Sequence, residues 1–420
     1  MVGSFSRHGA TAILELLGSF PVVVIAGARQ VGKTTLAKEL VRELGGTYLT
    51  LDDVSVRAQA LADPQGFVAA RTGMTVIDEV QLAPELLRAV KWSVDRDRSP
   101  GRFLLTGSAN LLRMKTVGES LAGRSAWFEL GPLTWAELAS RPRSTHLDRA
   151  FRCESASAWA EALPSSVSES LAAEARERAV RGGMPATLRL GPKARRAWYH
   201  GYRQTFLERD LRQLAQIENL PEFTRLMTVA ALRTASLLNQ SALAADTGLA
   251  VPTLRRYLAL LEIAYQFYEL PPFHTNHGKR LVKTPKLYAN DVGLAAHLDA
   301  LLTFDDALTA SRAGAFVETW AMNELLAIDR LGDRVSTATF FRTSAGREVD
   351  LVLERGQNLI GIELKAAATV SPSDTAGLRE LRDAVGKRFR LGIVAHLGTT
   401  TVVLDPRLVA VPLPALLGVA

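Results

Sequence analysis

The sequence predicts an α/β protein whose core is a parallel sheet between two layers of helices, followed by smaller domains. Two observations lead to this prediction. In the first 135 residues, five short apolar runs alternate with segments of helical periodicity, and no long structureless stretch separates them. One of these runs passes directly into a glycine-containing loop that ends in lysine and threonine, and a helical pattern follows it. A buried strand, a glycine loop and a helix in this order are typical of a phosphate-binding site.

Length and composition are those of a folded protein with several domains. The chain has 420 residues, of which 47% are hydrophobic and 22% charged, and this length suggests about two to four domains. The net charge of +7 suits nucleotide or nucleic-acid partners, although an ordinary soluble surface explains it equally well. The single cysteine, Cys153, excludes an intrachain disulfide and a cysteine-based zinc site, and it fits a reducing, cytoplasmic setting. The chain starts without a signal-peptide pattern and lacks a run of about 18 apolar residues, so no membrane span is expected.

The first apolar run, residues 21–26, predicts a buried parallel strand, and the loop after it matches G-x-x-x-x-G-K-[ST]. Gly27 and Gly32 allow a tight turn that directs backbone N–H groups at a phosphate, and the positive end of the next helix faces the same anion. Lys33 supplies a charge to the β- and γ-phosphates, and the Thr34 hydroxyl is expected to bind Mg²⁺. We therefore predict a site for ATP and Mg²⁺, with these nucleotide-binding residues: Gly27, Ala28, Arg29, Gln30, Val31, Gly32, Lys33, Thr34 and Thr35.

The next two apolar runs, 47–51 and 74–77, predict further strands, and the second of them ends in Asp78 and Glu79. An apolar strand followed by Asp-Glu is a Walker B pattern. Asp78 is expected in the magnesium shell, and Glu79 is expected to polarise the attacking water as the general base. This string is common by itself, but it becomes specific downstream of a P-loop with an intervening strand.

Two further candidate residues accompany the fourth and fifth runs. The fourth run, 102–108, ends at Ser108, our candidate for sensing the γ-phosphate, with Thr106 and Asn110 behind it. Arg124 comes just before the fifth run, 125–130. It could reach the γ-phosphate of a neighbouring subunit as an arginine finger, which predicts a homo-oligomer in the presence of ATP. A surface salt bridge explains Arg124 equally well.

These motifs resemble those of bacterial and archaeal AAA-type ATPases that carry a DUF4143 C-terminal region. The resemblance covers nearly the whole chain and rests on the segments 27–35, 77–81, 105–108 and 120–124. It implies an AAA+ core in which an additional strand separates the Walker B strand from the P-loop strand. The expected domains are an AAA+ P-loop core at 1–135, a helical lid at 136–198, a DUF4143 winged-helix region at 199–304 and a nuclease-like α/β domain at 305–420.

A helix-turn-helix pattern lies within the third of these regions. Residues 240–258 have apolar positions at helical spacing on both sides of a glycine, with Arg255 and Arg256 on the expected exposed face. The strand-like segment 265–270 and the basic loop 277–280 would form a wing. This arrangement suits DNA binding, and the alternative is a winged helix used only for protein packing.

Two alternating runs near the C-terminus, 348–353 and 359–365, predict strands that are antiparallel because their connection is short. Glu363 and Lys365 are two residues apart, so they point from the same face of a strand. Asp350 and Glu363 can meet across the hairpin and hold a divalent metal, while Lys365 can stabilise the nucleophile or the developing phosphate charge.

Glu318, on a predicted helix, would approach as a further metal ligand. The series Glu, Asp and Glu-x-Lys resembles the PD-(D/E)xK nuclease superfamily. A metal-dependent nuclease and a nuclease-like fold without activity both remain open.

The sequence therefore predicts an ATP-hydrolysing enzyme that couples its nucleotide state to a DNA-binding, nuclease-like C-terminal region. The alternative is an ATP-dependent switch or scaffold that acts on a protein partner, with an inactive nuclease-like domain. DNA-stimulated ATP turnover would distinguish the two.

Overall fold

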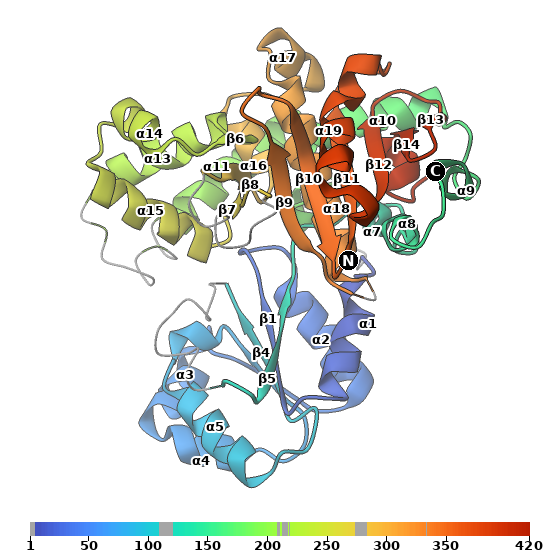
Figure 1. The fold of residues 1–420 in the computed structure, drawn as a ribbon. Helices are drawn as coiled ribbons and strands as arrows, with labels where there is room; N and C mark the ends of the chain where they lie inside the picture. Colours follow the sequence, from blue (N-terminus) through green and yellow to red (C-terminus); the bar gives the residue numbers. More distant parts are fainter. Residues whose placement is uncertain are drawn as a thin grey trace. The chain divides into compact units, whose positions relative to one another are not determined.

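The computed structural model describes residues 5–108, 121–207, 211, 217, 219–273, 284–332 and 334–420. The chain divides into two compact units, Met1–Leu133 with Ala259–Gln266 and Thr134–Leu258 with Phe267–Ala420. Figure 1 shows the elements of each. Among the described helices, none combines the length and the apolarity needed to cross a membrane.

The first unit is built on a five-stranded parallel sheet in the order β2-β3-β4-β1-β5. Each strand agrees with its predicted run to within one residue at either end. The Walker B strand β3 is separated from the P-loop strand β1 by β4, which confirms the expected additional strand. The strands are β1 (Val22–Ala26), β2 (Thr47–Thr50), β3 (Thr75–Asp78), β4 (Phe103–Gly107) and β5 (Ser125–Glu129).

Helices cover both faces of this sheet, as the sequence predicts. Alternate strand residues such as Val24, Ile77 and Leu105 pack with α3, α4 and α5 in one apolar core. Helices α1 and α2 contact the sheet from its other side (Figure 1). The helices are α1 (Gly9–Leu17), α2 (Lys33–Leu44), α3 (Val54–Ala62), α4 (Pro64–Ala69) and α5 (Leu86–Arg96), and a 3-10 turn, η1 (Val80–Leu82), follows β3.

The second unit begins with helices that the sequence analysis assigned to a lid. Residues 136–198 belong to this unit, in which α10 packs against α16 (Val292–Leu298) and α18 (Ala313–Arg330). The helices up to residue 205 are α7 (Trp135–Leu138), α8 (His146–Ala150), α9 (Ala156–Ala160), α10 (Glu169–Arg181) and α11 (Pro192–Thr205), with a 3-10 turn at η3 (Pro185–Thr187).

A helical group with a small antiparallel sheet follows. The sheet has the order β6-β8-β7, and α13 packs against both α14 and β8. The elements in chain order are α13 (Leu220–Leu232), β6 (Ser236–Leu237), α14 (Gln240–Thr247), α15 (Val251–Ile263), β7 (Phe267–Leu270), β8 (Lys286–Ala289), α16 (Val292–Leu298) and α17 (Phe304–Thr309).

The last part of the chain forms a mixed six-stranded sheet in the order β13-β14-β12-β11-β10-β9 (orange to red in Figure 1). Strands β10 and β11 are antiparallel, as predicted, whereas β11, β12 and β14 are parallel. Helix α19 packs on β10, β11 and β12, and α18 also contacts β11. The elements are α18 (Ala313–Arg330), β9 (Thr337–Arg342), β10 (Glu348–Arg355), β11 (Asn358–Lys365), η6 (Pro372–Thr375), α19 (Ala376–Val385), η7 (Gly386–Arg388), β12 (Phe389–His396), β13 (Val402–Asp405), β14 (Leu408–Pro412) and α20 (Leu413–Leu416).

Candidate functional site

The glycine loop between β1 and α2 has the backbone conformation that the motif requires. Gly27 has a φ of 151° and Gly32 a φ of 102°, and Gln30 also lies in the left-handed region, at 67°. A Cβ atom at Gly27 would lie 2.1 Å from the carbonyl oxygen of Leu130, so only glycine fits there without a shift of the backbone. The positive φ values and the close approach of Leu130 therefore explain why glycine stands at these positions.

Two cationic side chains hold the carbonyl groups of this loop. The buried Lys33 Nζ donates to the carbonyl oxygens of Gly27 at 2.9 Å and Ala28 at 2.8 Å. Arg7 donates to the carbonyl oxygen of Val31 in the loop at 2.8 Å and to that of Gly131, after β5, at 2.7 Å. Lys33 was predicted from the motif, whereas no pattern in the sequence identifies Arg7.

Asp78, at the carboxyl end of β3, accepts three hydroxyl groups. Thr34 Oγ1 lies 3.0 Å from Asp78 Oδ2, the Tyr48 hydroxyl donates to the same oxygen at 2.7 Å, and Thr106 donates to Oδ1. Burial and the hydrogen bond to Asp78 raise the pKa of Tyr48. Mg²⁺ prefers such hard oxygen donors, so the contact between Thr34 and Asp78 fits the predicted magnesium pair. Tyr48 and Thr106 were not predicted as partners of Asp78.

Glu79 follows in a left-handed backbone conformation with a φ of 58°. Its N–H donates to Thr106 Oγ1 at 3.2 Å. The Gln81 amide donates to the Glu79 carboxylate and, at 3.1 Å, to Ser108 Oγ. Gln81 thus brings together two predicted residues, Glu79 and Ser108. The sequence analysis quoted Gln81 within its motif but gave it no role, and Asn110 lies outside the described residues.

Arg124 forms an ion pair within its own unit. Its Nε lies 2.5 Å from Asp95 Oδ1, and its Nη1 donates to the carbonyl oxygen of Ala122 at 3.0 Å. The hydrogen bond from Arg124 lowers the pKa of Asp95 to about 2. This is the salt bridge that the sequence left open beside the arginine-finger interpretation.

The four residues predicted for a nuclease-like site lie together in the second unit, with three residues that were not predicted, Lys286, Tyr288 and Glu348, among them. Lys286 of β8 places its Nζ 2.7 Å from Glu318 Oε1 and 3.1 Å from Asp350 Oδ1, and it also contacts the Glu348 carboxylate. The Tyr288 hydroxyl donates to Glu318 Oε1 at 2.6 Å. We call these residues, with Glu363 and Lys365, the carboxylate cluster.

Glu363 and Lys365 form the other half of the cluster. Lys365 Nζ lies 2.8 Å from Glu363 Oε1 and 3.6 Å from Asp374 Oδ1, which agrees with the prediction that both side chains share one face of the strand. Asp350 Oδ2 accepts from the N–H of Leu364 at 2.9 Å. Burial, followed by the charge of Asp350, raises the pKa of the Glu363 carboxyl.

The carboxylate cluster as it stands does not fit a divalent metal. In the part of the chain that the structure describes, no three histidine, cysteine or acidic side chains are arranged to hold a metal ion. The ammonium group of Lys286 lies where the carboxylates of Glu318 and Asp350 converge. The only sequence signal for this lysine is a charged residue at the start of an apolar run.

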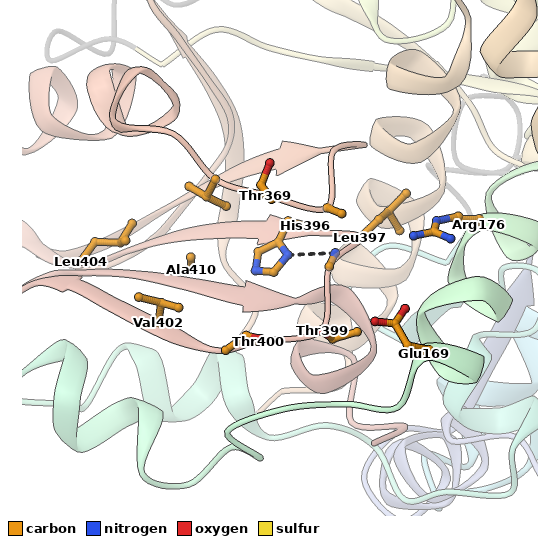
Figure 2. Close-up of a pocket in the computed structure, with 13 residues that line it drawn as sticks. Glu169, Arg176, Thr369, His396, Leu397, Thr399, Thr400, Val402, Leu404 and Ala410 are labelled. Carbon is orange, nitrogen blue, oxygen red and sulfur yellow. Dashed lines mark hydrogen bonds between the residues drawn. The ribbon is translucent and has the colours of Figure 1, made fainter.

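A cavity of about 470 Å³ lies elsewhere in the second unit, at the end of β12 (Figure 2). His396 is buried there, and its Nδ1 accepts from the N–H of Gly398 at 3.0 Å. Burial lowers the pKa of His396, against an opposite effect of the Thr400 backbone. The cavity shares no lining residue with the P-loop site or the carboxylate cluster. Its lining residues are Glu169, Arg176, Ala368, Thr369, Val370, His396, Leu397, Gly398, Thr399, Thr400, Val402, Leu404 and Ala410.

Three family models match the chain. The model described as AAA domain (AAA_14) matches residues 19–139. The model DUF4143, a domain of unknown function, matches residues 313–416. This match lies C-terminal to the region 199–304, where we expected DUF4143, and a different domain of unknown function, DUF8612, matches residues 172–306.

Solved structures with some likeness to this chain include a Walker-type ATPase and RuvB, a Holliday junction branch migration motor. The Walker-type ATPase PABY2304 of Pyrococcus abyssi is 17% identical, and the match covers 70% of this chain and 96% of that chain at a TM-score of 0.44. A RuvB variant from Thermotoga maritima is 20% identical, with 64% and 90% coverage and a TM-score of 0.29. These TM-scores are too low to support an inference.

Two curated relatives are similar over most of their length. Rv2008c of Mycobacterium tuberculosis and Mb2031c of Mycobacterium bovis are each described as an uncharacterized protein. Each is 32% identical over 412 residues, which cover 97% of this chain and 83% of the relative. With the P-loop geometry, the parallel sheet and the AAA and DUF4143 matches, this similarity shows that the chain belongs to the family of AAA-type ATPases that carry a DUF4143 C-terminal region.

Proposed function

We propose that this protein hydrolyses ATP with Mg²⁺ and that its nucleotide state controls DNA binding by the second unit. The observation that carries the ATPase part is the contact between Thr34 and Asp78, with Lys33 and Glu79 next to them in the chain. In this proposal, phosphate binding, metal binding and water activation fall to separate side chains at the carboxyl ends of β1 and β3, which β4 separates in the sheet.

In this proposal, Lys33 exchanges the carbonyl oxygens of Gly27 and Ala28 for the β- and γ-phosphates. Thr34 and Asp78 hold Mg²⁺, which neutralises charge on the phosphates when it is bound. Glu79 accepts the proton of the attacking water. Gln81 orients the Glu79 carboxylate and keeps Ser108 beside it, and this contact supports Ser108 as the residue that senses the γ-phosphate.

The DNA part of the proposal rests on the element order helix, strand, helix, helix, strand, strand from α13 to β8, which is that of a winged helix. Helix α15 is the second helix of the pair α14 and α15, and its Arg255 and Arg256 are exposed. Arg255 Nε also donates to Gln240 Oε1 of α14 at 2.8 Å. The Arg255 side chain nevertheless remains exposed to solvent. Exposed arginines on such a helix suit phosphate contacts. The predicted wing loop 277–280 lies outside the described residues.

We expect duplex DNA to raise the rate of ATP hydrolysis, and we expect the variant Arg255→Ala/Arg256→Ala to need more DNA for the same effect. Each phosphate contact that is lost should lower the slope of log affinity against log salt by about 1. The measurement is ATP turnover and DNA binding across a salt series.

The matched control is Arg379→Ala/Lys387→Ala, which removes two exposed positive charges near α19. The control should behave like the unmodified protein. If DNA neither binds nor changes turnover at any salt concentration, the DNA part of the proposal is wrong, and the switch or scaffold that acts on a protein partner is the better function. The position of Lys286 within the carboxylate cluster favours that second candidate, because it leaves the cluster without room for a catalytic metal.

We further propose a homo-oligomer in the presence of ATP, with Arg124 acting on the nucleotide of a neighbouring subunit. Arg124→Ala should lower turnover by about 10³-fold or more if Arg124 is a finger. Mixing Arg124→Ala with Lys33→Ala should then restore turnover. In the mixture, the intact P-loop of an Arg124→Ala subunit can lie beside the intact Arg124 of a Lys33→Ala subunit. Turnover of the mixture is measured against each variant alone.

Asp95→Ala is the control for this experiment, since it breaks the same ion pair but keeps the arginine. If Arg124 has only a structural role, Asp95→Ala and Arg124→Ala will have similar small effects and the mixture will show no rescue. That result, in a protein that stays monomeric with ATP, rules out the finger.

A further inference from the structure

The carboxylate cluster is built from three different parts of the second unit. Lys286 comes from β8 of the three-stranded sheet, Glu318 from α18, and Glu348 and Asp350 from β10 of the six-stranded sheet. The Lys286 side chain is only 3% exposed, and the carboxylates are between 8% and 20% exposed. Lys286 therefore reaches from one sheet into the acidic group of the other.

The hydrogen-bonding capacity of Lys286 is fully used. An ammonium group has three N–H donors, and Nζ lies against three carboxylates, those of Glu318, Glu348 and Asp350. The same oxygens are the hard donors that a divalent cation would use. The ring of Phe340, whose centroid is 5.7 Å from Nζ, borders the same place. The ammonium group therefore occupies the point at which these carboxylates converge.

The negative charges of the neighbouring carboxylates keep Lys286 in its cationic form. Burial alone lowers its pKa, but the charges of Asp350, Glu318 and Glu348 outweigh burial and raise it. A metal ion that approached with Lys286 in place would be repelled by a buried positive charge at close range. If Lys286 moved away and no other cation took its place, the negative charges of several buried carboxylates would be uncompensated, which is strongly unfavourable.

The lysine of the nuclease-like motif has a different position. Lys365 is half-buried and pairs with Glu363 and Asp374, at the border of the cluster. The second carboxylate oxygen of Glu363, Oε2, is buried and accepts no hydrogen bond in the described part of the chain. One carboxylate oxygen of Glu363 is therefore without a hydrogen bond in the described part of the chain. The carboxylates of Asp350 and Glu318, in contrast, both form ion pairs with Lys286.

We propose that Lys286 takes the place of the divalent cation in the carboxylate cluster, so that the cluster binds a metal only when Lys286 is removed or withdrawn. In this conformation the second unit is not a metal-dependent nuclease. The lysine instead joins the three-stranded sheet to the six-stranded sheet through Glu318 and β10. This proposal concerns the second unit alone and does not depend on ATP hydrolysis.

The test is Mn²⁺ binding by the full chain without nucleotide, measured by electron paramagnetic resonance. Lys286→Met keeps the apolar stem of the side chain and removes its charge. We expect this variant to bind Mn²⁺ on the order of 10²-fold more tightly than the unmodified protein, and we expect Lys286→Met/Asp350→Asn to lose the gain. Lys365→Met is the matched control: it also removes one lysine charge, but Lys286 still excludes the ion, so no site should appear.

Thermal unfolding gives a second readout. Mn²⁺ should raise the Tm of Lys286→Met more than that of the unmodified protein, because the additional site stabilises the folded state that binds the ion. A folded Lys286→Met protein without a new Mn²⁺ site would overturn the proposal. If Lys286→Met does not fold, the unmodified protein decides: Mn²⁺ binding that Asp350→Asn abolishes would overturn the proposal, and Mn²⁺ binding that Asp350→Asn leaves unchanged would support it.

Discussion

Replacing Glu79 with glutamine should leave ATP bound but stop its hydrolysis. The Glu79 carboxylate is held by the Gln81 amide beside Ser108, and a glutamine in its place cannot accept a proton from water. The loss of a general base lowers a rate by about 10² to 10⁴. The measurements are the dissociation constant of ATP and the rate of phosphate release for the same protein.

Lys33→Ala is the matched comparison, because it removes the charge proposed to bind the phosphates and leaves Glu79 intact. It should lose ATP binding itself, so that the two variants separate binding from chemistry. Gln81→Ala should fall between Glu79→Gln and the unmodified protein, since it frees the carboxylate without removing it. Normal hydrolysis by Glu79→Gln would assign the general base to another residue.

The first unit was largely predictable because its signals are local. The P-loop, the Asp78-Glu79 pair and five apolar runs each lie within a few consecutive residues, and the right-handed connections of a parallel sheet restrict how they can assemble. The strand positions were therefore predicted correctly, whereas the additional strand between β3 and β1 was expected from the family resemblance alone.

The partners of these residues were not predictable, because they depend on which side chains meet across the sheet. Tyr48 and Thr106 reach Asp78 from two neighbouring strands, and Arg7 reaches the loop from the N-terminal segment. Nothing in the local sequence marks a tyrosine or a threonine on a strand as a partner of a carboxylate. Such contacts follow from strand order and register, which are properties of the fold.

The second unit shows the same difference between features that local sequence patterns predict and contacts that depend on the fold. The hairpin of β10 and β11 and the placement of Glu363 and Lys365 on one face of a strand follow from chain connection and strand periodicity and were predicted. The contact between Lys286 and Asp350 joins residues from two different sheets, so no pattern in either segment specifies it. Likewise, the helical composition of residues 136–198 does not say that α10 packs against α16 and α18.

Replacing Asp78 with asparagine should remove the Mg²⁺ dependence of ATP hydrolysis together with most of the activity. In the proposed site, the carboxylate charge would pair with Mg²⁺ beside the Thr34 hydroxyl, and the amide of asparagine supplies no charge. Loss of the metal's charge stabilisation corresponds to several kcal/mol, or roughly 10² to 10³ in rate. Turnover is measured over a Mg²⁺ titration, and ATP binding is measured in the absence of Mg²⁺, where the variant should be close to normal.

Tyr48→Phe separates the charge of Asp78 from its hydrogen bonds. It removes the hydroxyl that lies 2.7 Å from Asp78 Oδ2 but leaves the carboxylate, so turnover should fall by roughly tenfold or less and the Mg²⁺ dependence should persist. If Tyr48→Phe and Asp78→Asn impair turnover equally, Asp78 acts by supporting the local structure. If Asp78→Asn keeps full Mg²⁺-dependent turnover, the metal is held by other residues and Thr34 loses its proposed partner. A large loss in Asp78→Asn alone would support the pair Thr34 and Asp78 as the magnesium site.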